Sequence, residues 1–380
     1  MTHPMTHLHG ATAPRQSARK DIHIMSLTLA PRCSGRTVAL GVALLATLAA
    51  APAAAQKKLD IVTTLTTYAS ITREVTGDLA NVRSIARGDV DPHFVAARPS
   101  FAGMMRNADM LVSTGLDLEL WLPGLLDRAN NPKIREGSPG HVVAYAGIRL
   151  LQVPTNVSRS GGDVHVFGNP HIHTDPINAI IIARNVAAGL KRIDPGHADT
   201  YDRNLADFEN RITHRLFGDR LVEMLGGETL VQLAMGTEFW SFLEGQSLDG
   251  HPLTYYLGGW LAQAAPFRDQ RMICYHKEWA YFSARFKVEC SMYIEPKPGI
   301  PPSPGHVREV MDFIRANHIP VLLAANFFSR SQVERVAQRT GATAVIVPMH
   351  EGGEDGVDDY FTLVDTWISR LSAAFQQHGS

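Results

Sequence analysis

The chain is poor in cysteine and in long hydrophobic runs, and its charge is close to balanced. It has 380 residues, 3 cysteines and a formal net charge of -1. A chain without a basic excess lacks the electrostatic footprint of nucleic-acid binding, which argues against nucleic acid as its main partner. Proline and glycine are not enriched enough for a disordered protein, so a folded, globular chain is expected.

Several motifs are also missing. The chain has no Walker A motif and no set of membrane-spanning segments, so it carries neither an ATPase nor a permease. It has no HExxH motif and no CxxC pair, the compact signatures of zinc proteases and of structural zinc sites. What it has instead is 17 histidines. Because histidine is the commonest metal ligand, their placement becomes the main question.

The longest apolar run, TVALGVALLATLAA at 37–50, predicts an export signal. It has the length of a signal-peptide core and is short for a membrane span. Arginines precede it, and the small residues at 53–55 offer a cleavage site. Residues 1–55 are therefore expected to be removed, so that the mature chain begins at Gln56 and resides in the periplasm. Met25 is an alternative start, because the polar stretch before it is unlike a signal peptide.

Strand and helix patterns alternate along the rest of the chain. Runs such as LDIVTT and DMLVSTG predict buried strands, and helical stretches lie between them. This alternation predicts parallel sheets, and the length predicts two domains. We therefore predict an α/β fold of two lobes, each a parallel β-sheet flanked by helices, joined by a long connector helix. The expected division is an N-terminal lobe at 56–196, the connector at 197–226 and a C-terminal lobe at 227–380.

Cys274 and Cys290 are the cysteines of the mature chain. An oxidising compartment would permit a disulfide between them. Their predicted places, at the end of one strand and at the start of the next, put them apart in a parallel pair, which argues against a bridge.

Three histidines stand where a parallel sheet presents ligands. His93 lies in a DPH loop, His171 lies in an NPH loop, and His276 directly follows the predicted strand RMICY. Ligands of open parallel sheets bind beyond the carboxyl ends of the strands, so these imidazoles can converge in a cleft between the lobes. Three neutral imidazoles suit zinc. By residue type alone, however, a loop histidine is more often a solvated or hydrogen-bonded side chain.

Four segments carry a resemblance to a known family. They are LDIVTTLTTYASITREVTGDLANVRSIARGDVDPHFVAARPS, ADMLVSTGLDLELWL, NPHIHTDPINA and YHKEWAYFSARF. Together they resemble the zinc/manganese family of solute-binding proteins of ABC importers, over nearly all of the mature chain. The resemblance implies metal ligands at His93, His171 and His276. It also implies a monomeric periplasmic protein that delivers its ion to a membrane permease driven by an ATPase.

Zinc is the expected cargo, and manganese is the alternative. Manganese-type members of the family tend to have a carboxylate where this chain has His276, and imidazole favours zinc over manganese, which prefers oxygen. The protein is not expected to be an enzyme. The alternatives are a secreted zinc hydrolase that uses the same histidines with Glu295 as general base, and a metal-dependent adhesin or metallochaperone on the same fold.

The chain departs from the family pattern around the predicted ligands. The usual acidic fourth ligand is not evident, and the fourth position stays open between water, Asn326, Glu295 and Ser329. His173 replaces the usual tryptophan and could compete as a ligand. Because it is only two residues from His171, it is expected to point away or to serve as a supporting or entry group.

Two further departures lie in connecting segments. The long histidine- and acid-rich loop of many zinc members is short here, and it retains His165. The segment 227–268 is longer than the family usually needs. Its aromatic and apolar residues are expected to cover the cleft or the edge of one lobe.

Overall fold

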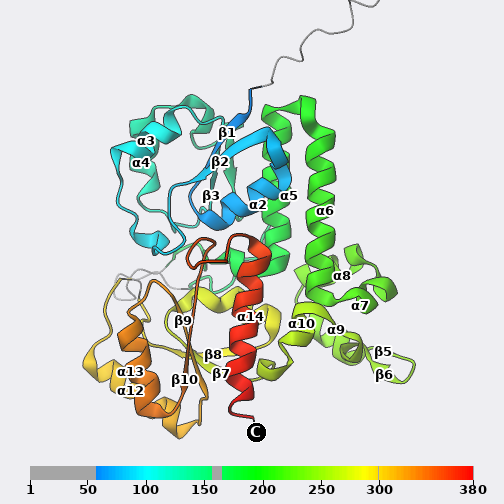
Figure 1. Cartoon of the computed structure of the whole chain (residues 1–380), viewed down its shortest axis with the longest axis vertical. Coiled ribbons are helices and arrows are strands. Elements are labelled where there is room, and N and C mark those ends of the chain that lie inside the picture. Colours follow the sequence, from blue (N-terminus) through cyan, green and yellow to red (C-terminus); the bar gives the residue numbers. More distant parts are fainter. Residues whose placement is uncertain (1–56, 156–164, 298, 380) are drawn as a thin grey trace, which may run out of the picture. The chain divides into compact units, whose positions relative to one another are not determined.

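The computed structural model describes residues 57–155, 165–297 and 299–379 of the chain. The expected signal peptide at 1–55 lies outside these residues. The described chain forms two parallel four-stranded sheets and one short antiparallel hairpin (Figure 1). No helix in this described part combines the length and the apolar composition needed to cross a membrane.

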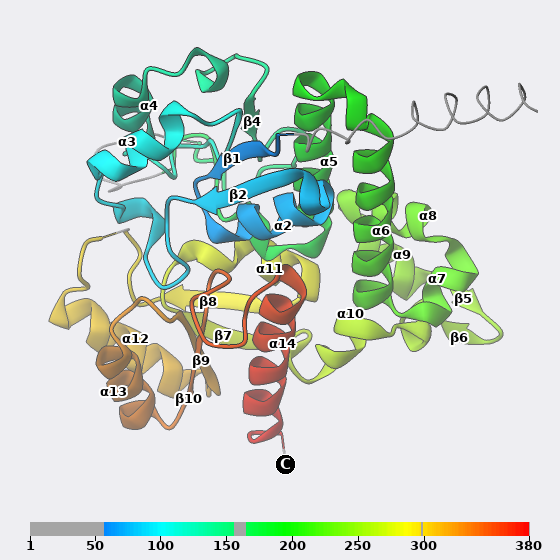
Figure 2. The same cartoon turned by 45° about the horizontal axis from the view of Figure 1, so that its top comes forward.

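The first sheet has helices on both faces. In spatial order its strands, all parallel, are β2 (Ala80–Ser84), β1 (Leu59–Thr63), β3 (Met110–Ser113) and β4 (His141–Val143). The helices are α2 (Thr66–Thr76) and α5 (Pro176–Ile193) on one face, and α3 (Pro99–Arg106) and α4 (Leu122–Ala129) on the other (Figure 2). Neighbouring strand residues point to opposite faces. Accordingly, Ile61 belongs to the core of α2 and α5, and Val62 to that of α3 and α4.

The second sheet follows the same plan. In spatial order its parallel strands are β10 (Thr343–Val347), β9 (Val321–Ala325), β7 (Arg271–Cys274) and β8 (Glu289–Tyr293). The helices are α12 (Pro304–Ala316) and α13 (Arg330–Thr340) on one face, and α11 (Ala280–Phe286) and α14 (Tyr360–Gln376) on the other. The predicted fold, two parallel sheets flanked by helices, is confirmed. The chain changes direction across the sheet between β7 and β9, which is where open α/β sheets bind ligands.

We had expected one continuous helix at 197–226, but the connector is broken. It consists of α6 (Ala198–Phe217) and α7 (Asp219–Leu225), which are separated by Gly218 at a φ of 82°. A Cβ atom on Gly218 would lie 2.3 Å from the Cα of Gly258, so the backbones meet too closely for any other residue. The helix α6 still packs on α2 and α5 of the first lobe and on α10 (Gly259–Gln263), which precedes the second sheet.

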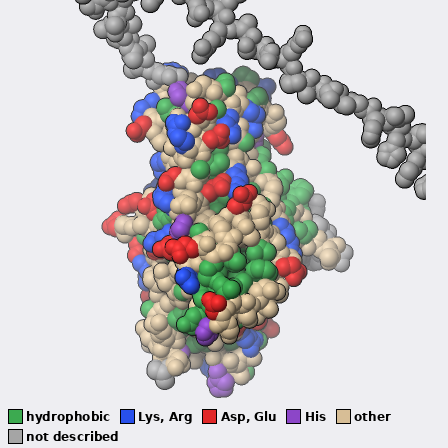
Figure 3. Space-filling model, turned by 90° about the vertical axis from the view of Figure 1, so that its right-hand side faces the viewer, with side chains coloured by type: hydrophobic (Ala, Val, Ile, Leu, Met, Phe, Trp, Pro, Cys, Tyr) green, Lys and Arg blue, Asp and Glu red, His purple; other side chains and the backbone are tan. Residues whose placement is uncertain are grey.

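The segment 227–268 covers helices rather than the cleft. It contains α8 (Gly227–Met235), α9 (Phe239–Gly245), a hairpin of β5 (Ser247–Leu248) and β6 (His251–Pro252), and α10. Within it, α8 packs on α5 and α6, and α10 packs on α6 and α14. Figure 3 shows hydrophobic side chains gathered in the middle of this side of the molecule, with acidic and basic side chains around them.

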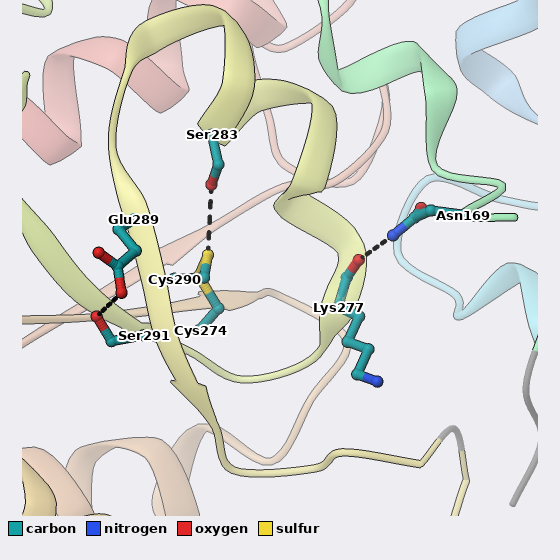
Figure 4. The surroundings of a disulfide bond; sticks show 7 residues. All are labelled: Asn169, Cys274, Lys277, Ser283, Glu289, Cys290 and Ser291. Atoms are coloured by element: carbon teal, nitrogen blue, oxygen red, sulfur yellow. Dashed lines mark hydrogen bonds between the residues drawn. A yellow bond between two sulfur atoms is a disulfide. The ribbon is translucent and has the colours of Figure 1, made fainter. Parts of the chain in front are cut away.

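Cys274 and Cys290 form a disulfide, with Cα atoms 5.5 Å apart, so the argument against a bridge was wrong. The strand β7 is so short that its end lies close to the start of β8. Cys290 pairs in register with Met272, which places Cys274 two residues further along the neighbouring strand and on the same face. Figure 4 shows the bridge beside α11, with Ser283 of that helix turned towards Cys290.

Candidate metal centre

The first predicted ligand, His93, is oriented by its own loop. It lies in a single turn of 3-10 helix, Pro92–Phe94, which is capped by Asp91. The Asp91 carboxylate accepts a hydrogen bond from the His93 backbone N–H at 3.0 Å and another from the ring Nδ1 at 2.6 Å. Burial acts to raise the pKa of Asp91, but the hydrogen bonds from His93 outweigh it and the pKa is lowered. Because the carboxylate can only accept, Nδ1 is the donor in this contact, and Nε2 is the nitrogen left to bind a metal.

The second predicted ligand, His171, lies just before α5 and is 1% exposed. Asn169 accepts a hydrogen bond from the His171 backbone N–H at 2.9 Å and donates from its side chain to the Lys277 carbonyl at 2.7 Å (Figure 4). One asparagine thereby joins the loop of the second ligand to the loop of the third. Burial lowers the pKa of His171 well below its usual value, so the ring stays neutral.

The third predicted ligand, His276, stands two residues beyond the end of β7 and is 2% exposed. Its Nδ1 lies 2.8 Å from the Glu295 carbonyl oxygen, which can only accept, so Nδ1 carries the proton and Nε2 is free to bind. Burial lowers the pKa of His276 to about 4, although the hydrogen bond to Glu295 acts in the opposite direction.

The three predicted histidines come together. Each offers one ligand atom within 4.8 Å of those of the other two, although the residues come from three separate loops. Neither ring nitrogen of His171 has a hydrogen-bond partner among the described residues. A buried polar atom without a partner costs about 1–3 kcal/mol, so such a ring is well suited to a cation. Chemically, the cluster can hold a divalent ion with neutral nitrogen donors.

A fourth histidine, His165, lies beside the cluster, and the sequence alone did not identify it as a ligand. Its Nε2 is 3.2 Å from the Nε2 of His93, and the two rings stack with centroids 5.2 Å apart. Burial, followed by the nearby His93, lowers the pKa of His165 to about 3. The available signal was its place in the same short loop as His171.

The protein groups considered for the fourth position differ in how far they are engaged. The Asn326 amide nitrogen donates to the Gly353 carbonyl at 2.6 Å, but its Oδ1 is buried and has no hydrogen-bond partner among the described residues. Glu295 accepts a hydrogen bond from the Gly299 N–H at 2.9 Å, and the exposed Ser329 contacts another serine hydroxyl.

His173 lies outside the three-histidine cluster. It is fully buried, and its ring packs against that of His350 with centroids 4.6 Å apart. Tyr360 of α14 donates to the backbone carbonyl of His173 at 2.8 Å, which fixes the chain here against the second lobe. This placement agrees with the expectation that His173 points away from the ion.

Glu351, in the loop after β10, is expected to make the stability of the protein depend on pH. Burial, opposed by the nearby Thr67, raises its pKa from 4.5 to about 7. A carboxyl group whose pKa is higher in the folded state destabilises the fold when it ionises, so stability is lost as the pH rises through about 7. Glu351→Gln cannot ionise. We expect it to match the wild type at pH 5 and to be up to ~3 kcal/mol more stable at pH 8, measured by urea unfolding.

The matched control for this prediction is Glu354→Gln, three residues on. Glu354 is partly exposed and pairs with Arg370, and the hydrogen bond from Arg370 lowers its pKa. Its substitution is not expected to stabilise the protein at either pH. A Glu351→Gln effect that is the same at pH 5 and pH 8 would show that Glu351 does not titrate in this range.

Comparison with known families gives one match over most of the chain. The model of the family described as zinc-uptake complex component A, periplasmic, matches residues 61–215 and 260–374. The unmatched residues 216–259 contain α7, α8, α9 and the β5–β6 hairpin. They overlap the segment that we had expected to be longer than the family needs.

Three characterised proteins illustrate the similarity. The iron-binding protein YfeA of Yersinia pestis is 25% identical over 333 residues, which are 86% of this chain and 89% of YfeA. The zinc-binding lipoprotein AdcA of Streptococcus pneumoniae is 21% identical over 336 residues, which are 86% of this chain and 57% of AdcA. The manganese ABC transporter substrate-binding lipoprotein PsaA of Streptococcus pneumoniae is 28% identical over 160 residues, 41% of this chain and 48% of PsaA.

Solved structures share the fold. The crystal structure of ZnuA aligns with a TM-score of 0.61 at 20% identity and covers 84% of this chain and 100% of that one. The cadmium-bound periplasmic metal-binding protein of Candidatus Liberibacter asiaticus aligns with a TM-score of 0.57 at 17% identity, with coverages of 84% and 100%.

Proposed function

We propose that this protein binds one zinc ion between its lobes and delivers it to an importer. The proposal starts from the family to which the chain belongs, that of the periplasmic zinc-uptake complex component A. Members of this family are the substrate-binding components of metal ABC transporters. The finer statements, that the metal is zinc and that delivery is to a permease driven by an ATPase, are our proposals. So are the periplasmic location and the monomeric state.

The observation that carries the proposal is the meeting of three buried imidazoles. His93 and His276 each direct Nδ1 at an acceptor, a carboxylate in one case and a carbonyl in the other. The other nitrogen of each ring is thereby left unprotonated, and partners of this kind also fix the orientation of a metal-binding histidine. His171 adds a ring whose nitrogens are unpartnered. The apo protein therefore holds ligands that need little proton loss or reorientation to receive an ion.

The donor set supports zinc over manganese. The relatives named above bind different metals, so similarity alone does not choose among them. Three imidazole nitrogens suit zinc, whereas manganese prefers carboxylate and carbonyl oxygen. The Asp91 carboxylate accepts a hydrogen bond from Nδ1 of the His93 ring, and so acts on the site through that ring.

Binding and release, rather than hydrolysis, is the chemistry that this site supports. A zinc hydrolase needs a base beside a metal-bound water. The residue considered for that role, Glu295, instead accepts a hydrogen bond from the Gly299 N–H through its carboxylate and one from His276 through its backbone carbonyl. The proposed role is therefore that of a carrier, and the adhesin and metallochaperone alternatives share the same site.

Calorimetric titration of the purified protein with zinc and with manganese tests the proposal. We expect one zinc per chain and manganese binding at least about 100-fold weaker, because the donors are nitrogen. Equal affinity for the two ions would contradict the choice of zinc. Failure of both ions to bind would contradict the metal site itself.

A further inference from the structure

The three predicted ligands leave one corner of a tetrahedral site unassigned, and a fourth imidazole stands next to it. His165 approaches from the loop before α5. Its ring centroid lies 5.2 Å from that of His93 and 6.0 Å from that of His171. The three predicted ligands have their own centroids 5.2 to 6.1 Å apart. His165 thus lies as far from His93 and His171 as the predicted ligands lie from one another, although its ligand atoms are not all within 4.8 Å of those of the three-histidine cluster.

The distance between ligand atoms agrees with tetrahedral zinc. Zinc–nitrogen bonds of about 2.0–2.1 Å place neighbouring nitrogens about 3.4 Å apart in a tetrahedron. The Nε2 atoms of His165 and His93 are 3.2 Å apart. His93 Nδ1 contacts the Asp91 carboxylate, which leaves Nε2 as the ring nitrogen that faces His165, so the Nε2 atoms of both rings can bind one ion.

We propose that His165 is the fourth ligand, so that the ion is held by four imidazole nitrogens with no exchangeable water. This inference rests on the proposed function, because it concerns the same ion. A site with four protein ligands is closed, as in structural zinc sites, whereas a site with three keeps an open position. Four nitrogens also strengthen the preference for zinc over manganese. In the ion-free protein, a hydrogen bond from His165 to His93 also explains the 3.2 Å between their Nε2 atoms. The experiment below distinguishes a His165 that binds the ion from one that only forms this hydrogen bond.

Cobalt(II) substitution provides the test, because its visible spectrum reports on its ligands. The wild type, His165→Ala and the control His251→Ala, an exposed histidine of the β5–β6 hairpin, are loaded with cobalt(II) and titrated with azide. We expect azide to leave the wild-type and His251→Ala spectra unchanged and to shift that of His165→Ala. Zinc affinity of His165→Ala should fall at least about tenfold, since even supporting groups around a metal cost that much.

The outcomes separate this inference from the proposed function. If azide shifts the wild-type spectrum as it does that of His165→Ala, the site has an open position and His165 is not a ligand. If neither spectrum responds, loss of His165 opens no position, and the inference is likewise overturned. If the wild type binds neither cobalt nor zinc, the proposed function fails, and this inference fails with it.

Discussion

His171→Ala is expected to weaken zinc binding at least about 1000-fold, a loss of about 4 kcal/mol. The reason is that His171 is the most buried of the three predicted ligands, and neither of its ring nitrogens has a partner within the described chain. Asn169, two residues before it, is held by its bonds to both site loops and is not free to replace it. Competition with a zinc chelator gives the dissociation constants.

The matched control is His173→Ala, the same substitution two residues along the chain. His173 is also buried, and its ring nitrogens likewise lack partners among the described residues, but its ring packs against His350 and lies outside the three-histidine cluster. We expect this variant to keep zinc affinity within about threefold of the wild type, while removal of packing lowers its stability. Thermal unfolding separates the two effects, because saturating zinc should raise the melting temperature of His173→Ala but not that of His171→Ala. The opposite pattern would make His173 the ligand.

The second large effect is expected at Asp175, which joins the two lobes beside the site. Its carboxylate receives two hydrogen bonds from Arg285 of α11, at 2.8 and 2.9 Å, and both side chains are 8% exposed. It also accepts from the Ile177 N–H and so caps α5. Asp175→Ala leaves a buried guanidinium without its carboxylate and removes the cap. We expect a loss of about 3–5 kcal/mol in the free energy of unfolding, measured with urea.

Two comparisons test the cause of that loss. In the double variant Asp175→Ala/Arg285→Met no buried charge is left unpaired, so we expect it to recover much of the stability. Asp207→Ala removes an exposed partner of Arg211 within α6 and should cost less than about 1 kcal/mol. If Asp175→Ala costs no more than Asp207→Ala, the buried ion pair does not hold the lobes together as described.

The fold was predictable because its determinants are local. Short apolar runs such as Leu59–Thr63 and Val321–Ala325 mark strands that are covered on both faces, and helical segments separate them. The start of α5 was equally clear, since an aspartate followed by a proline caps a helix and occupies its first turn. The three site histidines became candidates because they follow predicted strands, whose ends converge in a parallel sheet, but it was the family resemblance that implied their role as ligands.

Three features could not be predicted from the sequence, because they depend on the register of paired strands or on contacts between residues far apart in the chain. The disulfide follows from the pairing of Cys290 with Met272, which strand boundaries alone do not give. The break at Gly218 results from its close approach to Gly258, 40 residues later. His165 comes from a loop that carries no periodic pattern, so only its position in space brings it to His93.

Anomalous diffraction at the zinc absorption edge, from crystals grown with zinc, tests the central claim most directly. The account predicts one strong peak about 2.0–2.1 Å from the Nε2 atoms of His93 and His276 and from a ring nitrogen of His171. A peak at His173 and His350, or no ordered zinc between the lobes, would contradict it.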